Sequence, residues 1–356
     1  MQAINFYTTS GMNPHTGYGK LEIGLLRGLQ AIGVAVNPFG PMSWDTLRLL
    51  SESDRFELVA HLPSTSCPTI ITGLPQNGEY ASGGERWFYG MSESTQVSHA
   101  WVQDLNDLYT GVFVPCPELV TIYQDCGVTV PVFNVGMGND YHLPPARLGF
   151  KRWDGNGEFI FLTYSYGDMR KGAHLALLAF KALFHDQSNM KLWIKARGAR
   201  QTWLAGCQDE QVNIFHDAMT ETEWLTMLRR ANAFVFPSYG EGYGLPPREA
   251  TLSGTPTIAT QWLGLHDVDQ WGYPVKVGRM LPAQFDFYEA NGQNGQWAEP
   301  DLDDLKRQML AVVTDYPRAT YRAYKGRHYL LQQTWAKTAG LMMEVITTYG
   351  THSAAA

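Results

Sequence analysis

Residues 237–260, PSYGEGYGLPPREATLSGTPTIAT, show most clearly how the second half of the chain is built. They follow the apolar run 233–236, which predicts a strand, and they begin with a glycine-rich loop whose backbone can approach a ligand closely. Pro246 and Pro247 suit the first turn of a helix, and Gly254 suits its end. The order strand, glycine loop, helix, strand is typical of a parallel α/β unit.

Two glutamates in this stretch indicate its chemistry. The N–H groups at the start of the expected helix favour an anion, above all phosphate. Glu249 in the helix can accept hydrogen bonds from the two hydroxyls of a ribose, and Glu241 in the loop can do the same for a sugar. The stretch therefore predicts a pocket for a sugar joined to a nucleoside through phosphates.

Two other interpretations of the same glutamates stay open. Glu249 can be a first-turn residue that complements the helix dipole, with Glu241 a solvated loop residue. A glycosidase pair requires carboxyl groups about 5–9.5 Å apart. Eight helical steps of about 1.5 Å would separate these two by roughly 12 Å, which weighs against hydrolysis.

The rest of the chain alternates β-rich apolar runs with helical periodicity, which predicts an α/β architecture with largely parallel sheets. The periodicity predicts one helix through Leu21, Leu25, Leu29 and Ile32, a second whose shared face runs from Leu175 to Leu183, and a third around Trp224. Helices are also expected at 117–126 and through much of 317–349. Strands are expected at 4–8, 57–60, 69–72, 111–114, 131–135, 158–164, 191–195, 212–215 and 233–236.

The length of 356 residues favours two domains at roughly 150 residues per domain. The periodicity is lost over 143–157, LPPARLGFKRWDGNG, as in an exposed connection. We expect a first domain at 1–145, a linker at 146–157, a second domain at 158–330 and a C-terminal helix within 331–356. Ligands of open parallel sheets bind outside the carboxyl ends of the strands.

Composition excludes several classes of protein. With 44% hydrophobic and 13% aromatic residues, the chain is globular and not disordered. The net charge of −7 gives no chain-wide reason to expect nucleic acid as partner. No apolar run approaches the roughly 20 residues of a membrane span, and the start, MQAINFYTTS, lacks the features of a signal peptide. We therefore expect a cytoplasmic protein. Its scattered cysteines predict neither a zinc site nor a disulfide framework.

The segment EGYGLPPREA, 241–250, resembles the E-x7-E signature of the family 4 glycosyltransferases. These are retaining enzymes that use nucleotide sugars, and their GT-B fold has two Rossmann-like domains with parallel sheets facing an interdomain cleft. The similarity extends to 98–128, 131–140, 169–180 and 297–310, so that roughly the whole chain can be aligned. The resemblance also implies that the C-terminal helix packs back on the first domain.

The resemblance implies catalytic roles for Glu241, Lys171 and Arg170. Glu241 would contact hydroxyls of the donor sugar, Lys171 the diphosphate and Glu249 the ribose. Many members have an arginine where this chain has Tyr166, so Arg170 is expected to supply the second phosphate contact. The expected donor-binding residues are Gly17, Gly19, Tyr166, Lys171, Gly242, Tyr243, Gly244, Leu245 and Glu249.

Some of these basic residues have a simpler explanation. Arg170 and Lys171, with Lys181 further along, can also form a solvated helix face. Lys195, which ends the expected strand KLWIK, is a further basic candidate for the site.

The first domain contributes weaker candidates. TGYGK, 16–20, resembles the family's first glycine-rich loop, which approaches the donor phosphates or the acceptor. It is not a dinucleotide fingerprint, because Glu22 stands where the third glycine would be. Glu93 resembles an acceptor-side carboxylate of some members, but it can equally be a solvated residue beside a helix cap at Ser92 or Ser94. The segment 76–88 has the glycine and aromatic content of a mobile acceptor loop or of a plain surface loop.

We therefore expect a retaining hexosyl- or pentosyltransferase that moves a sugar from a UDP-, GDP- or ADP-sugar to a hydroxyl acceptor. The acceptor would be a glycan, a lipid or a small molecule, and no metal or cofactor is required. Nothing assigns a role to His15, His61 or His99. One alternative is a GT-B-like sugar-nucleotide-binding protein without turnover, which Tyr166 leaves open. Another is a transferase acting on hydroxylated DNA bases, which predicts a basic, aromatic-lined channel on the first domain.

Overall fold

A computed structural model describes residues 3–13, 16–41, 64–81, 84–139, 153–166, 169–197, 202–285 and 294–350. These residues form two compact units. Unit 1 lies within Met1–His142 and Gln333–Ala356 together with Asn294, and unit 2 lies within Leu143–Tyr288 and Gly295–Gln332. The expected strand at 57–60, His15, His61 and much of the expected linker lie outside the described residues.

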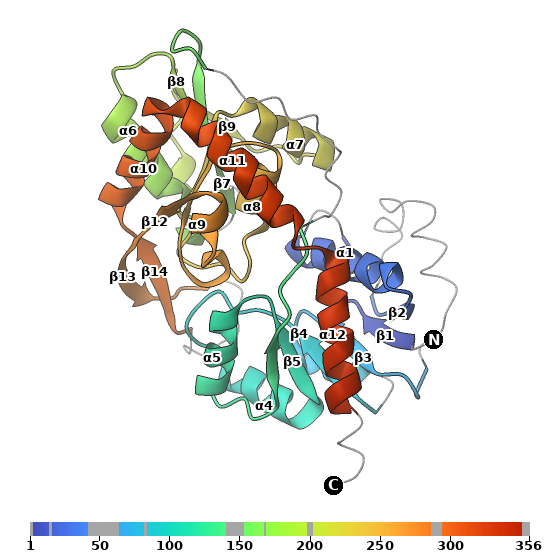
Figure 1. Ribbon diagram of the computed structural model, residues 1–356. Helices are drawn as coiled ribbons and strands as arrows, with labels where there is room; N and C mark the ends of the chain where they lie inside the picture. The colour runs from blue at the N-terminus through green and yellow to red at the C-terminus, as the bar shows by residue number, and fades with distance from the viewer. Residues whose placement is uncertain are drawn as a thin grey trace. The chain divides into compact units, whose positions relative to one another are not determined.

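Unit 1 contains a six-stranded parallel sheet in the order β2-β1-β3-β4-β5-β6 (Figure 1). Its strands are β1 (Ala3–Tyr7), β2 (Ala35–Phe39), β3 (Thr69–Thr72), β4 (Arg86–Tyr89), β5 (Gly111–Val114) and β6 (Val132–Asn134). Its helices are α1 (Gly17–Ala31), the 3-10 helix η1 (Pro75–Tyr80), α4 (His99–Leu108), α5 (Pro117–Asp125) and α12 (Trp335–Tyr349).

Two strands of unit 1 were not expected from the sequence. β2 carries Pro38, which lowers its strand signal, but β2 lies at the sheet edge, where a missing N–H is tolerated. β4 begins within 76–88 and ends at Tyr89, so the expectation of a loop over that whole segment is wrong. Trp87 and Phe88 are fully buried, and β4 pairs with both β3 and β5. Glycines around this short strand hide it in the sequence.

The helix caps correct a further expectation. Ser98 caps α4 and accepts a hydrogen bond from the Trp101 backbone N–H, so neither Ser92 nor Ser94 is a helix cap. The Ser92 hydroxyl instead donates to the carbonyls of Ser94 and Gln96, and it holds a turn between β4 and α4.

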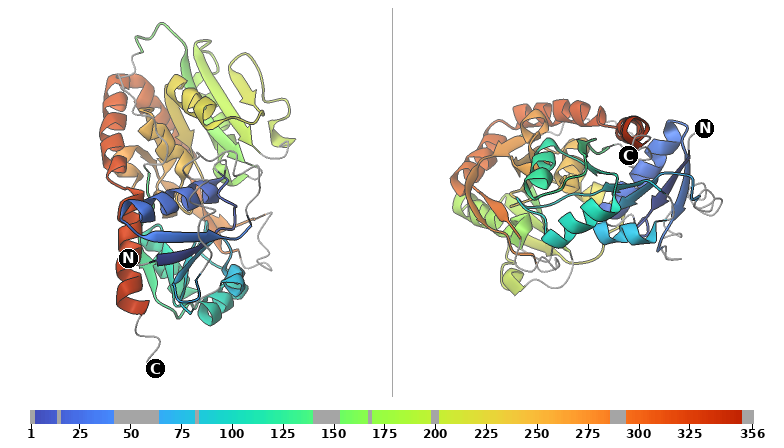
Figure 2. Two further views of the ribbon diagram at one scale, coloured as in Figure 1. Left: turned by 90° about the vertical axis from the view of Figure 1, so that its right-hand side faces the viewer. Right: turned by 90° about the horizontal axis from the view of Figure 1, so that it is seen from below.

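Helix α12 packs closely on α1, as Figure 2 shows from below. Glycines of α1 make this approach possible. A Cβ atom at Gly24 would lie 2.1 Å from the Trp335 ring, and one at Gly28 would lie 2.3 Å from the Trp335 carbonyl oxygen. Trp335, at the start of α12, is 4% exposed. The C-terminal helix is therefore part of unit 1's packing.

Unit 2 contains a second six-stranded parallel sheet, in the order β12-β11-β10-β7-β8-β9. Its strands are β7 (Phe159–Tyr166), β8 (Met190–Arg197), β9 (Val212–Phe215), β10 (Ala233–Phe236), β11 (Thr257–Thr260) and β12 (Tyr273–Val275). An antiparallel hairpin is formed by β13 (Val277–Pro282) and β14 (Gln296–Pro300).

Helices cover both faces of this sheet. Side chains of α6 (Ala173–Phe184) and α10 (Leu302–Thr314) share one core with the sheet. Side chains of α7 (Glu221–Arg230), α8 (Leu245–Leu252) and α9 (Val268–Trp271) share a second, to which Leu330 of α11 (Tyr316–Leu331) also belongs. Leu178 was expected on the buried face of α6, but it is 55% exposed. The short 3-10 helices are η2 (Met169–Lys171), η3 (Thr202–Leu204) and η4 (Leu263–Leu265).

In each sheet the strand order reverses beside the first strand, between β1 and β3 in unit 1 and between β7 and β10 in unit 2. Neighbouring connections then leave on opposite faces of the sheet, and a crevice opens at the carboxyl ends of the two strands. These two switch points are where the fold favours ligand binding. In the described part of the chain, no helix has the length and apolar character needed to cross a membrane.

The packing of α1 on α12 predicts that Gly28→Ala destabilises unit 1 by about 1–3 kcal/mol, because the new methyl group meets backbone that cannot move alone. Gly340→Ala, in α12, is the matched control. Nothing lies within 4 Å of a Cβ at Gly340, so this change stabilises the helix by about 0.5–1 kcal/mol. Urea denaturation measures both, and equal stabilities for the two variants would contradict the described packing.

Candidate functional site

The switch point of unit 2 holds a buried ion pair. Lys171, in the turn after β7, donates from Nζ to both carboxylate oxygens of Glu241, in the loop after β10, at 2.7 and 2.9 Å. The hydroxyl of Ser238 donates to Glu241 Oε1 at 2.7 Å. Arg170 Nη1 donates to the same oxygen at 3.3 Å and to the Gly240 carbonyl at 2.6 Å. The three sequence-predicted catalytic residues therefore meet at one point.

Backbone contacts between the two loops place these side chains. Gly172 follows Lys171 with φ of 70°, and a Cβ there would lie 1.8 Å from the Pro237 carbonyl oxygen, so glycine is required. The Tyr239 backbone N–H donates to the Arg170 carbonyl at 2.8 Å. The ends of β7 and β10 are thus joined directly.

The cluster places two cationic side chains, Lys171 and Arg170, beside the Glu241 carboxylate. Burial alone would raise the pKa of Glu241, but Lys171 and Arg170 outweigh it and hold that pKa below its usual range. Two cations then face one carboxylate, and their side chains are at most 11% exposed. Buried cationic side chains at a switch point make it a candidate site for an anionic ligand. Lys171 is not part of a solvated helix face, whereas Lys181 is, in a partly exposed ion pair with Asp209.

The glycine loop continues from Glu241 into α8. Gly244 takes the left-handed conformation with φ of 81° and caps the helix, which begins at Leu245. The loop lies against η4, since a Cβ at Gly264 would meet the Gly242 carbonyl carbon and oxygen at 2.4 Å. The Gly264 N–H donates to the Glu241 carbonyl at 2.9 Å. Glycine is thus needed at Gly264 for this contact and at Gly244 for its left-handed conformation.

A buried ion pair behind the loop was not expected from the sequence. Arg248 of α8 donates to both oxygens of Asp267, at 2.8 and 3.1 Å, and also to the carbonyls of Tyr243 and Gly264. Its guanidinium stacks over the Tyr243 and Trp271 rings. Burial alone would raise the pKa of Asp267, but Arg248 outweighs it and holds that pKa well below its usual range.

Apart from the charge of Arg248 in the expected helix, nothing in the sequence signals this pair. The two partners lie 19 residues apart, so local spacing could not join them.

Glu249 lies one residue further along α8 and is half-buried. The Trp224 indole N–H donates to its Oε2 at 2.7 Å, a contact that orients the carboxylate. Tyr166 ends β7 and is 40% exposed, and the Arg197 guanidinium, its partner in strand register, lies 5.9 Å from its ring centre. Arg197 was not expected from the sequence.

Lys195 is 5% exposed and donates to the carbonyls of Ala196, Phe215 and Asp217. Burial, with Arg197 nearby, lowers the pKa of Lys195. Lys195 therefore joins β8 to the loop after β9, and its ammonium group is bound to backbone carbonyls.

In unit 1, the predicted residues gather at the start of α1. Gly17 is exposed, and Gly19 lies against the backbone of Asn13. Burial raises the pKa of Tyr18, between these glycines, and the charge of Glu93 raises it further, which places Glu93 near this helix turn. His99 is exposed at the start of α4.

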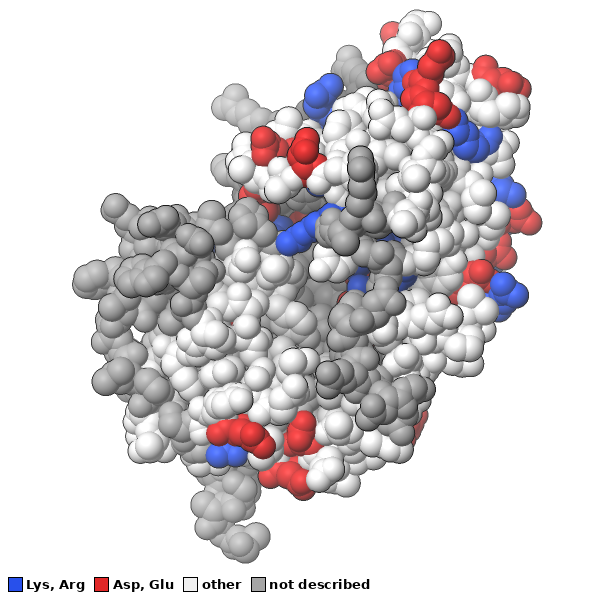
Figure 3. Space-filling view, turned by 180° about the vertical axis from the view of Figure 1, so that it is seen from behind, with Lys and Arg blue, Asp and Glu red and all other residues white. Residues whose placement is uncertain are grey.

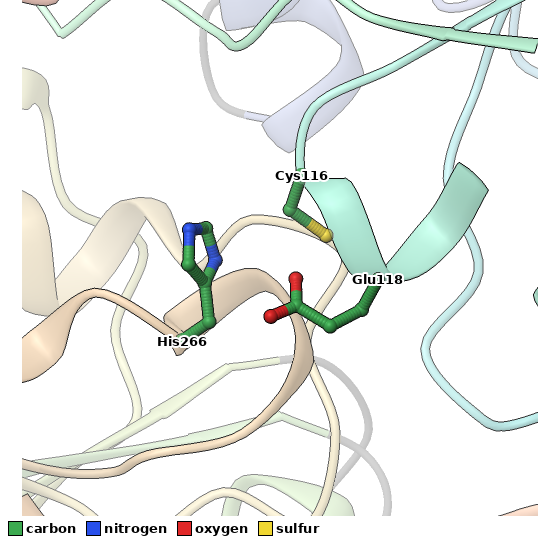
Figure 4. A group of neighbouring side chains, drawn as sticks. All are labelled: Cys116, Glu118 and His266. Atoms are coloured by element: carbon green, nitrogen blue, oxygen red, sulfur yellow. The ribbon is translucent and has the colours of Figure 1, made fainter. Parts of the chain in front are cut away.

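Other charged side chains and groups able to bind a metal lie outside this site. Figure 3 shows acidic and basic side chains in small groups on the face it presents; the described part of that face carries no broad basic strip. Cys116 directly precedes α5 and Glu118 lies in its first turn, as Figure 4 shows. His266, in the same figure, follows η4 of unit 2.

Residues 150–270 match the family described as glycosyl transferases group 1. This range includes Lys171, Glu241 and Glu249. The serotype-specific mannosyltransferase WbdA of Escherichia coli is 30% identical over 137 residues, which are 38% of this chain and 14% of that protein. A glycogen synthase of Mycobacterium tuberculosis is 28% identical over 168 residues, 46% of this chain and 36% of that protein. The chain therefore matches well under half of the length of either relative.

Among solved structures, a sucrose-phosphate synthase from Thermosynechococcus elongatus is similar with a TM-score of 0.66 and 16% identity, over 98% of this chain and 99% of that one. The fold is thus of the GT-B type, and the expected pair of parallel α/β sheets is confirmed. The match to glycosyl transferases group 1 over residues 150–270 confirms the resemblance at that level and over that range. The domain boundaries, the cleft and the site roles stay predictions.

The buried pair behind the loop predicts that Arg248→Met destabilises unit 2 by about 3–5 kcal/mol, because Asp267 is left as an uncompensated buried charge. Arg279→Met is the matched control, since Arg279 pairs with Glu299 at the surface with 68% of its side chain exposed, and little change is expected there. Thermal denaturation followed by tryptophan fluorescence compares the two. Equal effects would show that the Arg248 pair does not stabilise the unit.

Proposed function

We propose that the protein is a retaining glycosyltransferase that moves a sugar from a nucleotide diphosphate sugar to a hydroxyl acceptor. The observation that carries the proposal is the buried Lys171–Glu241 pair at the unit 2 switch point, with the Arg170 guanidinium beside it. The group 1 domain match over the same residues supports it.

The donor would lie along the carboxyl ends of β7 and β10. Lys171 would exchange part of its contact with Glu241 for the diphosphate, and Glu241 would then accept from hydroxyls of the donor sugar. Glu249, oriented by Trp224, would accept from the ribose hydroxyls. The loop of Gly242, Tyr243, Gly244 and Leu245 would bring backbone N–H groups toward the phosphates.

Arg170 takes a different role in this proposal from the one expected from the sequence. Its side chain is 4% exposed and its Nη1 is directed at Gly240 and Glu241. It would hold the loop and the carboxylate in place and contact the donor through them. Arg197 lies beside Tyr166 at the carboxyl ends of β8 and β7. Its guanidinium is more exposed than that of Arg170, and it is the better candidate for a second phosphate contact.

Catalysis would be mainly electrostatic. Negative charge grows on the diphosphate as the anomeric bond breaks, and Lys171 with the α8 N-terminus would stabilise it more than the ground state. This requires neither metal nor cofactor in our proposal. The acceptor would be a glycan, a lipid or a small molecule, and the donor a UDP-, GDP- or ADP-sugar.

A thermal-shift comparison of UDP, GDP and ADP tests the donor site. One nucleoside diphosphate should raise the Tm at millimolar concentration while the other two do not, because selective binding to the folded state stabilises it. The selective base then names the donor class. If none of them changes the Tm, the assignment of the switch point as a donor site is wrong.

Lys171→Gln should weaken binding of that diphosphate by about 10–100-fold, the loss of one charge-assisted hydrogen bond. Lys181→Gln is the matched control, since Lys181 pairs with Asp209 near the surface, and it should leave affinity unchanged. Glu249→Gln should weaken binding by about 10-fold. Isothermal titration calorimetry measures all three, and unchanged affinity of the Lys171 variant would remove its proposed role.

A transfer assay with radiolabelled donor separates an enzyme from a binding protein. Transfer to an acceptor or hydrolysis of the donor supports the proposal, and the anomeric configuration of the product tests retention. Tight binding of the diphosphate with neither reaction, across a wide acceptor panel, would favour a sugar-nucleotide-binding protein.

A further inference from the structure

Glu22 lies at the switch point of unit 1, and its carboxylate is fully buried. It projects from α1 into the loop that follows β1. Three backbone N–H groups of that loop donate to it: Thr9 at 2.9 Å and Ser10 at 3.1 Å to Oε1, and Met12 at 2.9 Å to Oε2. So many amide donors on one side chain indicate an anion-binding arrangement of the backbone.

Hydroxyl groups also donate to the Glu22 carboxylate, and together with the three N–H groups they form what we call the anion cage. Thr72, the last residue of β3, donates to Glu22 Oε1 at 2.8 Å, and the Ser10 hydroxyl donates to Oε2. Because β1 and β3 flank the point where the strand order reverses, Glu22 joins the two loops that border the crevice of unit 1. A Cβ at Gly73 would meet the Thr9 side chain at 2.2 Å, so these loops are also in direct contact.

The loop backbone is shaped around this carboxylate. Gly11 and Met12 both take the left-handed conformation, with φ of 63° and 56°. The conformation is uncommon for a residue with a side chain, and Met12 is fully buried. Left-handed residues turn successive N–H groups toward one centre, forming a concave nest of donors of the kind that binds phosphate in other loops. Here the centre of that nest is the protein's own carboxylate.

We propose that Glu22 is the internal anion of the loop between β1 and α1, and that it fixes this loop in a form that takes no phosphate. The N–H groups that a phosphate would need are already engaged, and the negative charge of Glu22 repels a second anion. The sequence-based expectation that this loop approaches the donor phosphates is replaced by a positioning role. Resting on the proposed function, the inference extends to the substrate: the part of the acceptor at this loop carries no phosphate group.

Chemical rescue tests the internal anion without any substrate. Glu22→Ala should lower the Tm of the protein by about 10 °C, since several buried donors lose their acceptor. Sodium acetate at ~100 mM should restore about 3 °C or more of this loss relative to equal concentrations of sodium chloride or acetamide. Glu79→Ala, at an exposed position of η1, should show no loss and no acetate effect. Identical Tm values of the Glu22 variant in acetate, chloride and acetamide would overturn the proposal.

Two further measurements apply even if Glu22→Ala does not fold. In Glu22→Gln, which keeps the shape of the side chain, amide exchange at Thr9, Ser10 and Met12 should speed by about 10-fold or more. Exchange at Ile70 of β3 should be unchanged. In the wild-type protein, inorganic phosphate or a nucleoside diphosphate should leave the NMR signals of those three amides in place. A saturable shift of the amides on adding phosphate would show that the loop binds phosphate and refute the inference.

None of these readouts depends on transfer activity. If the protein binds no nucleoside diphosphate, the proposed function is wrong. The role of Glu22 is still tested separately, by the acetate rescue and the amide exchange.

Discussion

The ion pair between Lys171 and Glu241 is the interaction on which the arrangement of unit 2 around its site depends. It joins the turn after β7 to the loop after β10, across the point where the strand order reverses. The pair is buried, so its carboxylate needs every donor it receives, and those donors come from Arg170 and Ser238 as well as Lys171. This contact between two side chains holds the turn after β7 against the loop that leads into α8.

The two switch points differ in how they arrange charged groups and hydrogen-bond donors. Each has a turn after the first strand of its sheet and a loop on the neighbouring strand. Unit 2 brings the cationic side chains of Lys171 and Arg170 to Glu241, and in our proposal Lys171 also binds an anionic ligand. Unit 1 brings backbone donors together and supplies the anion itself from Glu22. If both proposals hold, an anionic ligand is bound in unit 2, and the loop between β1 and α1 of unit 1 binds none.

The sequence predicted those parts of the fold that depend on local patterns. Strands at 69–72, 111–114, 212–215 and 233–236 agree with the structure because their apolar runs end at clear turn residues. β4 was missed because Gly83 and Gly84 before it and Gly90 after it give the segment the composition of a loop, and its strand character shows only in its pairing with β3 and β5. In the site, too, local patterns identify some residues and miss those that depend on contacts between distant segments. Lys171 and Glu241 could be found as motif residues, whereas the Arg248–Asp267 pair and the Glu22 cage depend on contacts between segments that no local spacing reveals.

The burial of Arg248 and Asp267 also bears on how the protein responds to its solution. Mobile ions screen charges that water can reach, but they act weakly on a pair whose side chains are 1% and 9% exposed. The loop held by this pair should therefore keep its shape over a wide range of ionic strength. A phosphate entering from water at the same loop is subject to screening. Under our proposal, added salt would lower the affinity for the donor but leave the conformation of the loop unchanged. Donor affinity and loop rigidity would therefore respond differently to ionic strength.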